Sequence, residues 1–262
     1  MLEPPLTSIP AKGFSASVRK TRPLTKRKRA GRPPIPAPEI EALDSESDEP
    51  IERQIYLALR RSLMSGAILP GSRISSRSIA SSLGVSAMPV REALKRLESD
   101  GAMKSSAKSC FVINFPTVEE FAEILQIRLR LEIMLAREAT PRLSDAEIEQ
   151  ISWLQERMAQ SKSWRQVLSY NYKMHFQIYR AASMPFALSL VENIWVKIGP
   201  TLHVVYDEKT GTTPFDHHYT IIEGLRERDP EKVEQAIRSD LKDAATVIKQ
   251  RLSSGFRAVK MA

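Results

Sequence analysis

Hydrophobic positions divide the chain into an irregular first part and two patterned parts. Residues 1–48 contain many prolines and show no helical period, so we expect a disordered, basic and proline-rich tail. From Ile51 the apolar residues recur every four positions, through Ile55, Leu59 and Leu63, which predicts an amphipathic helix. Gly66 can end that helix in a left-handed conformation.

Two more helices and a pair of strands are expected before residue 117. The first begins at Ser75 or Ser76, turns Ile79 and Leu83 inward and stops at Gly84. Ser86 is a good N-cap for the second, which ends at Gly101 and whose buried stripe is Val90, Leu94 and Leu97. Residues 102–115 predict two short strands, the better one at 111–113. This order is typical of a winged helix-turn-helix domain, which we place at residues 49–116.

The pattern is helical from Val118 almost to the end of the chain. We expect helices near 118–138, 144–160, 164–182, 185–207, 216–227 and 230–252, and no strand among them. Their short loops predict antiparallel neighbours around a common core. The expected fold is therefore mainly α: the winged helix-turn-helix domain, an antiparallel all-helical bundle at 117–252 and a C-terminal tail at 253–262.

Composition narrows the class of protein. Hydrophobic residues make up 42% of the 262 residues, enough for packed cores. No apolar run is long enough to span a membrane, and no signal-peptide pattern occurs at the N-terminus. One cysteine, Cys110, excludes an internal disulfide and fits a reducing compartment. We therefore expect a cytoplasmic protein with no membrane association.

The distribution of charge points to a polyanionic partner. The net charge is +8, and residues 117–262 contribute nothing to it because they hold twenty basic and twenty acidic residues. Residues 49–116 hold ten basic and five acidic residues. A basic segment beside a neutral one favours nucleic acid, although a solvated charged surface is the simpler alternative. Residues 26–34 partly resemble an AT-hook, and a solvated charge run is again the simpler interpretation.

One helix has the layout of a DNA-reading element. Opposite its buried stripe, Met88, Arg91 and Lys95 lie three to four residues apart. Arg91 can contact guanine or clamp a phosphate, and the helix N-terminus at Ser86 is suited to bind phosphate. A solvated face is the alternative for these side chains, but the surrounding order of elements favours DNA.

The same residues carry a family resemblance. The stretches 69–74 (LPGSRI) and 83–97 (LGVSAMPVREALKRL) resemble regulators of the GntR family. That resemblance implies a homodimer bound to a pseudo-palindromic operator in double-stranded DNA. The predicted DNA-binding residues are Arg77, Ser86, Met88, Pro89, Arg91, Lys95 and, near the wing tip, Lys108. Ala87 stands where the family usually has arginine, which implies an altered operator or weaker binding.

Polar residues interrupt the apolar faces of the bundle. Asn171 and His175 form an i, i+4 pair, while His218 and Asp240 lie on two later helices. Inward polar groups need partners, so they can build a metal site or a small-ligand site. A hydrogen-bonded core histidine is the more common explanation of either histidine alone.

The bundle also resembles the helical FCD domain of FadR-like GntR regulators. This resemblance implies that Asn171, His175, His218 and Asp240 bind a divalent metal such as Zn, Mn or Ni. Asn171 and Asp240 depart from the usual aspartate and histidine, so a metal-free pocket that binds an organic acid directly stays open. Arg128 can clamp an effector carboxylate, or simply pair with Glu132.

These features predict a ligand-responsive, DNA-binding transcription regulator. The resemblance implies a repressor of a catabolic operon whose operator affinity changes on binding a small organic acid, a carboxylate effector. The alternative is a constitutive or architectural DNA-binding protein without an effector. The chain contains no Glu-x-x-His pair, P-loop or G-x-S-x-G motif, so we predict that it is not an enzyme and has no catalytic residue.

Overall fold

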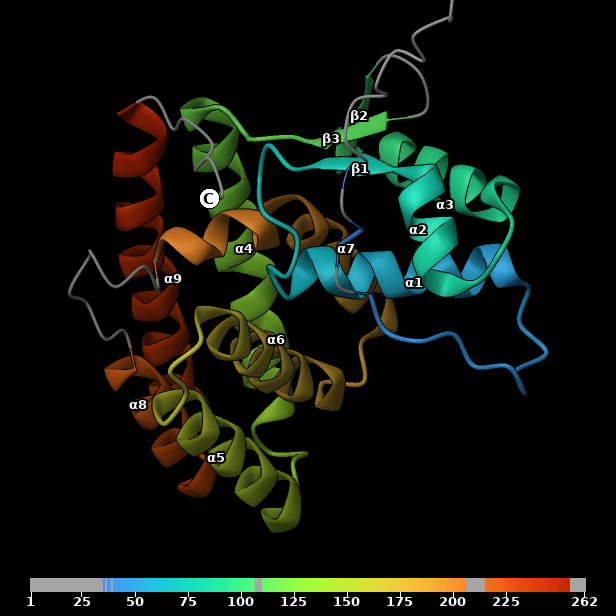
Figure 1. Ribbon diagram of the computed structural model, residues 1–262. Coiled ribbons are helices and arrows are strands. Elements are labelled where there is room, and N and C mark those ends of the chain that lie inside the picture. The colour runs from blue at the N-terminus through green and yellow to red at the C-terminus, as the bar shows by residue number, and fades with distance from the viewer. Residues whose placement is uncertain (1–34, 36, 39, 107–109, 206–214, 255–262) are drawn as a thin grey trace, which may run out of the picture. The chain divides into compact units, whose positions relative to one another are not determined.

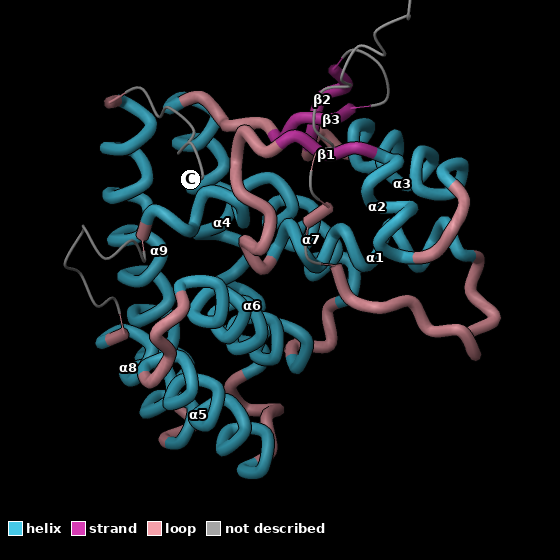
Figure 2. The backbone as a smooth tube through the Cα atoms, viewed as in Figure 1, coloured by secondary structure: helices cyan, strands magenta, loops and turns pink. Residues whose placement is uncertain are grey.

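The computed structural model describes residues 35–254 except 36, 39, 107–109 and 206–214. Within these ranges the chain forms helices and one small sheet (Figure 1 and Figure 2). Most of the predicted N-terminal tail, with its AT-hook-like run, lies outside the described residues, as do Lys108 and residues 255–262. None of the described helices combines the length and the apolar character that a membrane span needs.

The first helices form as the periodicity predicts. They are α1 (Ile51–Met64), α2 (Ser76–Leu83) and α3 (Ala87–Ser99). Gly84 ends α2 with a left-handed φ of 67°. Ser86 is the N-cap of α3, as predicted, although its side chain makes no capping hydrogen bond. Ile51, in the first turn of α1, is 49% exposed, so the buried stripe of that helix begins at Ile55.

The wing is part of a three-stranded antiparallel sheet. Its strands are β1 (Arg73–Ser75), β2 (Met103–Ser106) and β3 (Cys110–Ile113), in the order β1-β3-β2. In the register of β1 with β3, Ile74 lies opposite Phe111, and both side chains are buried. Strand β1 was not predicted from the sequence, because three residues are too few to show an alternating pattern.

The predicted helical bundle follows. Its elements are α4 (Val118–Ala139), α5 (Asp145–Ala159), α6 (Trp164–Ala181), α7 (Pro185–Ile198), the 3-10 helix η1 (Gly199–Val204), α8 (Asp216–Arg226) and α9 (Pro230–Ser253). Capping boxes begin α4 at Thr117 and α5 at Ser144, and the Asp229 side chain caps α9. The helix expected at 185–207 is wrong in its second half: Pro200 has no N–H for the α-helical ladder, and the chain tightens into η1.

Helix α1 of the winged helix-turn-helix domain packs against α7 and η1 of the bundle. Arg60, only 8% exposed, donates from Nη1 to Asn193 Oδ1 at 2.9 Å and to the Tyr56 hydroxyl at 3.1 Å. Tyr56 in turn donates to Asp100 Oδ2 at 2.7 Å, directly after α3. A buried arginine therefore joins the domain that contains α3 to the middle of α7.

Gly199 marks the tightest approach between these elements. A Cβ atom there would lie 2.4 Å from the Leu63 carbonyl oxygen and 2.7 Å from the Met64 carbonyl oxygen. Neither backbone group can move without shifting the end of α1, so we expect Gly199→Ala to lower the free energy of unfolding by about 3 kcal/mol. Gly84→Ala is the control, because no heavy atom lies within 4 Å of its Cβ and only the left-handed φ costs about 1 kcal/mol. Urea unfolding compares the two; equal losses would contradict this packing.

Candidate functional site

The predicted DNA-binding side chains lie on the outer surface of the first domain. Met88 is 75% exposed at the start of α3, and Arg91 and Lys95 are exposed on the same helix. Arg77 is exposed on α2, and Ser86 at the turn before α3, whereas Pro89 is half-buried. Lys95 Nζ lies 3.1 Å from Glu92 Oε1. We call the exposed members of this set the exposed basic region around α3: Arg77, Ser86, Met88, Arg91 and Lys95.

In the bundle, three predicted residues from three helices meet in the core. His175 Nε2 on α6 lies 3.5 Å from Asp240 Oδ2 on α9, and His218 Nε2 on α8 lies 3.4 Å from Asp240 Oδ1. The two histidine side chains are 2% and 0% exposed and the aspartate 11%. One ligand atom from each residue lies within 4.8 Å of the others, so the group can hold a metal ion. We call these three residues the His/His/Asp cluster.

The spacing within the His/His/Asp cluster fits a small divalent cation. Both nitrogen–oxygen distances, 3.4 and 3.5 Å, are longer than a good N–H···O hydrogen bond. Tetrahedral zinc bonds of about 2.1 Å place neighbouring ligand atoms about 3.4 Å apart. His218 Nε2 is also buried without a hydrogen-bond partner. An atom of this kind is expected to have a partner, and a cation would supply it.

A chain of hydrogen bonds fixes the His175 ring. Tyr179, one turn later on α6, donates its hydroxyl proton to Glu132 Oε2 at 2.7 Å. Burial and the neighbouring Glu132 charge raise the pKa of Tyr179 well above 10, so this proton stays in place. The hydroxyl oxygen therefore accepts from His175 Nδ1 at 3.1 Å. With its proton on Nδ1, the imidazole presents an unprotonated Nε2 to the cluster.

Glu132 anchors this arrangement from α4. Its carboxylate, 0% exposed, accepts hydrogen bonds from Arg128 Nε at 2.6 Å, from Tyr179 and from Trp195 Nε1 at 3.1 Å. Arg128 is therefore held in a buried ion pair, and its guanidinium also lies 5.2 Å from the Trp195 ring centre. Arg128 therefore forms the i, i+4 salt bridge with Glu132 that was one of its two predicted roles. A contact between Arg128 and an effector stays a proposal.

Electrostatics keeps the cluster ready to bind a cation. Burial lowers the pKa of His175 to about 4, even though the Asp240 charge opposes the shift. Burial alone would raise the pKa of Asp240, but the positive charges of His218, His175 and Arg128 lower it to about 2. At neutral pH the cluster therefore offers a neutral His175 and an ionised Asp240, which are the forms that ligate metals.

The structure brings together three of the four residues in the predicted metal set. Asn171, the fourth, is buried one turn before His175 on α6. Three residues that were not predicted from the sequence also contact the cluster or Glu132: Gln155, Tyr179 and Trp195. Tyr179 was detectable, because an i+4 position shares the face of His175. Gln155 and Trp195 lie on other helices and gave no local signal.

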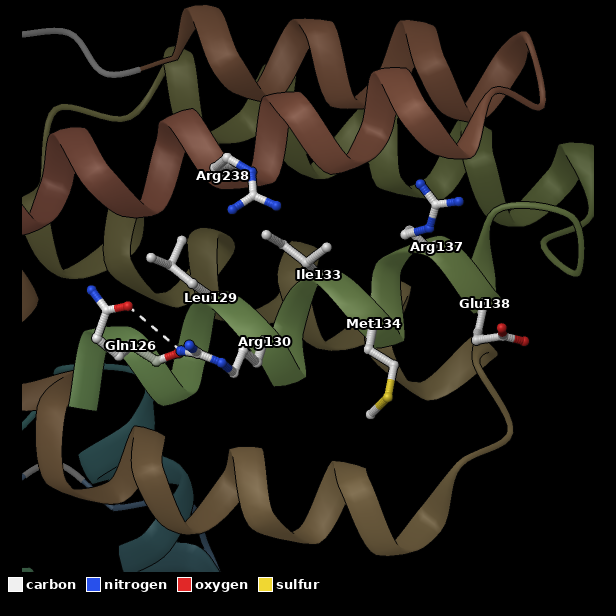
Figure 3. Close-up of a pocket in the computed structure, with 8 residues that line it drawn as sticks. All are labelled: Gln126, Leu129, Arg130, Ile133, Met134, Arg137, Glu138 and Arg238. Carbon is white, nitrogen blue, oxygen red and sulfur yellow. Dashed lines mark hydrogen bonds between the residues drawn. The ribbon is translucent and has the colours of Figure 1, made fainter. Parts of the chain in front are cut away.

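A separate groove lies between α4 and α9. It encloses about 510 Å³, and Figure 3 shows Arg238 of α9 pointing toward Leu129 and Ile133 of α4. Its other lining residues are Gln126, Arg130, Met134, Arg137 and Glu138. Arg137 and Arg238 already pair with Glu234, and Arg130 donates to the backbone and side-chain oxygens of Gln126. No residue of the His/His/Asp cluster lines it.

Comparison with known proteins divides the chain into two matched regions. Residues 51–113 match the profile of bacterial regulatory proteins of the gntR family, and residues 123–243 match that of the FCD domain. The chain is 29% identical to the HTH-type transcriptional regulator McbR of Escherichia coli K12 over 68% of its length and 83% of the relative's. It is 26% identical to the gluconate operon transcriptional repressor of Bacillus subtilis over 72% and 82% of the two lengths.

A solved structure shows the same architecture. The structure of Escherichia coli McbR/YncC superposes with a TM-score of 0.71 and 26% sequence identity. The match covers 78% of this chain and 99% of that one. The two-part fold expected from the sequence is therefore confirmed, and so is the expected class of DNA-binding regulator rather than enzyme.

The lowered pKa of His175 predicts a specific loss of stability in acid. In the unfolded chain the pKa of histidine is 6.5, whereas in the folded chain the pKa of His175 is about 4. The contribution of His175 to the free energy of unfolding is therefore complete above pH 6.5 and is lost as the pH falls toward 4. In the presence of a chelator, we expect the free energy of unfolding to fall by about 2 kcal/mol more in the wild type than in His175→Gln between pH 7.5 and 5.0. Urea unfolding at both values measures this difference, and parallel curves would show that His175 does not titrate as described.

Proposed function

Because the chain belongs to the GntR family of transcription regulators and carries an FCD domain, we propose that it represses a catabolic operon in response to a small carboxylate effector. It would bind a pseudo-palindromic operator as a homodimer in the cytoplasm, and the effector would change its operator affinity. The name of the Bacillus subtilis relative joins repression to a gluconate operon, which supports an organic acid as the ligand.

The His/His/Asp cluster is the observation that carries this proposal. His175, His218 and Asp240 would hold a divalent ion, Zn, Mn or Ni, with Asn171 one turn away on α6. Two neutral imidazoles and one carboxylate leave a bound divalent ion with a net charge of +1. Bound, the ion supplies a Lewis acid that attracts carboxylate oxygens. Burial excludes water and strengthens that attraction.

The exposed basic region around α3 would carry the DNA contact. Recognition helices place their N-terminal residues against base edges in the major groove, which fits the exposure of Met88 and Arg91. Arg77 and Lys95 would neutralise phosphates, while Ser86 and Pro89 position the helix N-terminus against the backbone. Lys108 would add a contact from the wing.

Helix α7 offers a route from the ligand site to the DNA-binding domain. Trp195 bonds Glu132 and lies 5.8 Å, ring centre to ring centre, from His175. Two residues earlier, Asn193 accepts from Arg60 of α1. A ligand that shifts α7 would therefore change the support of α1 and, through Tyr56 and Asp100, of α3. A coupling free energy of this kind typically changes affinity by roughly 5- to 150-fold.

The experiment that tests this function measures operator affinity against ligand and ion. The operator is first selected from random-sequence DNA with the wild-type protein, and a panel of small carboxylic acids is then titrated with and without added Zn²⁺, Mn²⁺ or Ni²⁺. A change in operator affinity that needs both acid and ion supports the proposal. If the acid changes operator affinity without an added ion, the protein binds the acid directly and not through a metal. If no acid changes operator affinity, the protein is a constitutive DNA-binding protein.

Removing Arg91 is expected to weaken binding to the selected operator. One lost two-pronged base contact costs about 1–3 kcal/mol, so the Kd of Arg91→Ala should rise roughly 10- to 100-fold in fluorescence anisotropy. Lys162→Ala is the control, because it removes one positive charge from the other domain. Equal effects of the two variants would mean that only net charge matters.

Removing Asn193 is expected to uncouple the two sites. Asn193→Ala deletes the hydrogen-bond acceptor of Arg60 on α7 but no residue of the cluster, and leaves the longer contact of Arg60 with Glu192 at 3.7 Å. Operator affinity without effector should stay within about threefold, while the effector-induced change should fall below about threefold. Ser189→Ala is the control on the same helix, since its hydroxyl bonds the nearby Phe186 carbonyl. An effector response as large as that of the wild type would exclude the Asn193–Arg60 hydrogen bond as the route.

A further inference from the structure

Gln155 on α5 is the other partner of the His/His/Asp cluster. Its Oε1 lies 2.8 Å from His218 Nδ1, and both side chains are fully buried. The side-chain nitrogen of Gln155 and Nε2 of His218 are the buried side-chain atoms without a hydrogen-bond partner in the described part of the chain. Both thus belong to this one hydrogen-bonded pair.

This contact sets which ring nitrogen of His218 carries the proton. An amide oxygen only accepts, so Nδ1 must be protonated and Nε2 is left with a free lone pair toward Asp240. The Tyr179 hydroxyl imposes the same state on His175. Outer contacts of this kind orient metal-binding histidines and typically change metal affinity about 10- to 100-fold when they are removed.

The uncharged nature of Gln155 has a second consequence. Metal-binding histidines often donate to a carboxylate, which would bring another negative charge. In this cluster the outer partners are an amide and a phenol, and the nearby carboxylate of Glu132 is neutralised by Arg128. A divalent ion with Asp240 as its one charged ligand would keep an uncompensated charge of +1 in the core.

We propose that Gln155 is a positioning and specificity-determining residue: it holds His218 as the Nδ1–H form and, being neutral, leaves the loaded site positive so that it selects anionic ligands. The inference rests on the proposed function, because it assumes that the cluster binds an ion. It assigns a role to a side chain on α5 that is neither an ion ligand nor part of the Arg128–Glu132 pair.

Two substitutions at this position should act in opposite directions on ion affinity. Gln155→Glu keeps the acceptor, adds a charge and makes the imidazole more basic, so Zn²⁺ should bind at least about tenfold more tightly. Gln155→Leu leaves the Nδ1 proton without an acceptor, so Zn²⁺ should bind at least about tenfold more weakly. Calorimetric titration of Zn²⁺ into the full chain, with a competing chelator, measures both. Gln160→Glu, an exposed position at the end of the same helix, adds the same charge and should change nothing.

Anion binding and ring protonation provide readouts that a structural role alone would not change. The chain has four histidines, so selective ¹⁵N labelling gives a simple spectrum. His203 contacts the Pro200 carbonyl and His217 pairs with Asp243, and substituting each assigns its signals. Metal-free wild type should show His218 protonated on Nδ1.

Acetate titrated into the Zn²⁺-loaded proteins should bind about tenfold more weakly to Gln155→Glu than to wild type, because one unit of charge is cancelled.

The outcomes separate this inference from the proposal on which it rests. Uptake of Zn²⁺ by the wild type would support the ion site. If both Gln155 variants then bind Zn²⁺ within about twofold of the wild type, or if both bind it more weakly, Gln155 does not have the proposed positioning role. Protonation of His218 on Nε2 in the metal-free wild type would also overturn the inference. If wild type takes up none of Zn²⁺, Mn²⁺ and Ni²⁺, the ion site itself is wrong, and the role of Gln155 falls with it.

Discussion

The arrangement of the bundle core depends on the hydrogen bonds that the buried carboxylate of Glu132 accepts. This carboxylate joins α4, α6 and α7 through Arg128, Tyr179 and Trp195. Burying a carboxylate without such donors would cost free energy. The three donor side chains must therefore stay within hydrogen-bonding distance of Glu132 in the folded state. Tyr179 then determines the ring state of His175, and the indole of Trp195 packs against the same ring. The ring state of His175, one of the proposed ion ligands, is thus set by a residue that is not itself a ligand.

The same carboxylate is linked to the first domain through α7. Trp195 and Asn193 stand two residues apart on α7, one bonded to Glu132 and the other to Arg60 of α1. Arg60 is itself almost fully buried, so α7 cannot shift without changing a polar network that costs energy to disrupt. Gly199 holds the end of the same helix against the α1 backbone. In the proposed mechanism, a small change at the cluster would therefore reach α3 through Asn193, Arg60 and Tyr56.

Sequence patterns predicted most of the fold and part of the site. Helical periodicity located α1 to α6, α8 and α9 closely, because each buries a continuous stripe. It failed where a single covalent feature overrides the pattern, as at Pro200, or where an element is too short to have one, as at β1. Inward polar positions on α6, α8 and α9 predicted His175, His218 and Asp240, but not Gln155 or Trp195, whose roles depend on which helices pack together.

The His/His/Asp cluster is expected to bind one divalent ion within the core. This expectation is tested most directly by an X-ray structure of protein purified without chelator, with anomalous data collected on both sides of the absorption edge of the metal found by elemental analysis. We expect about one ion per chain, with an anomalous peak about 2.1 Å from Nε2 of both histidines and close to an Asp240 oxygen. Less than about a tenth of an equivalent of any metal after incubation with Zn²⁺, Mn²⁺ or Ni²⁺, and no peak between these three residues, would contradict it.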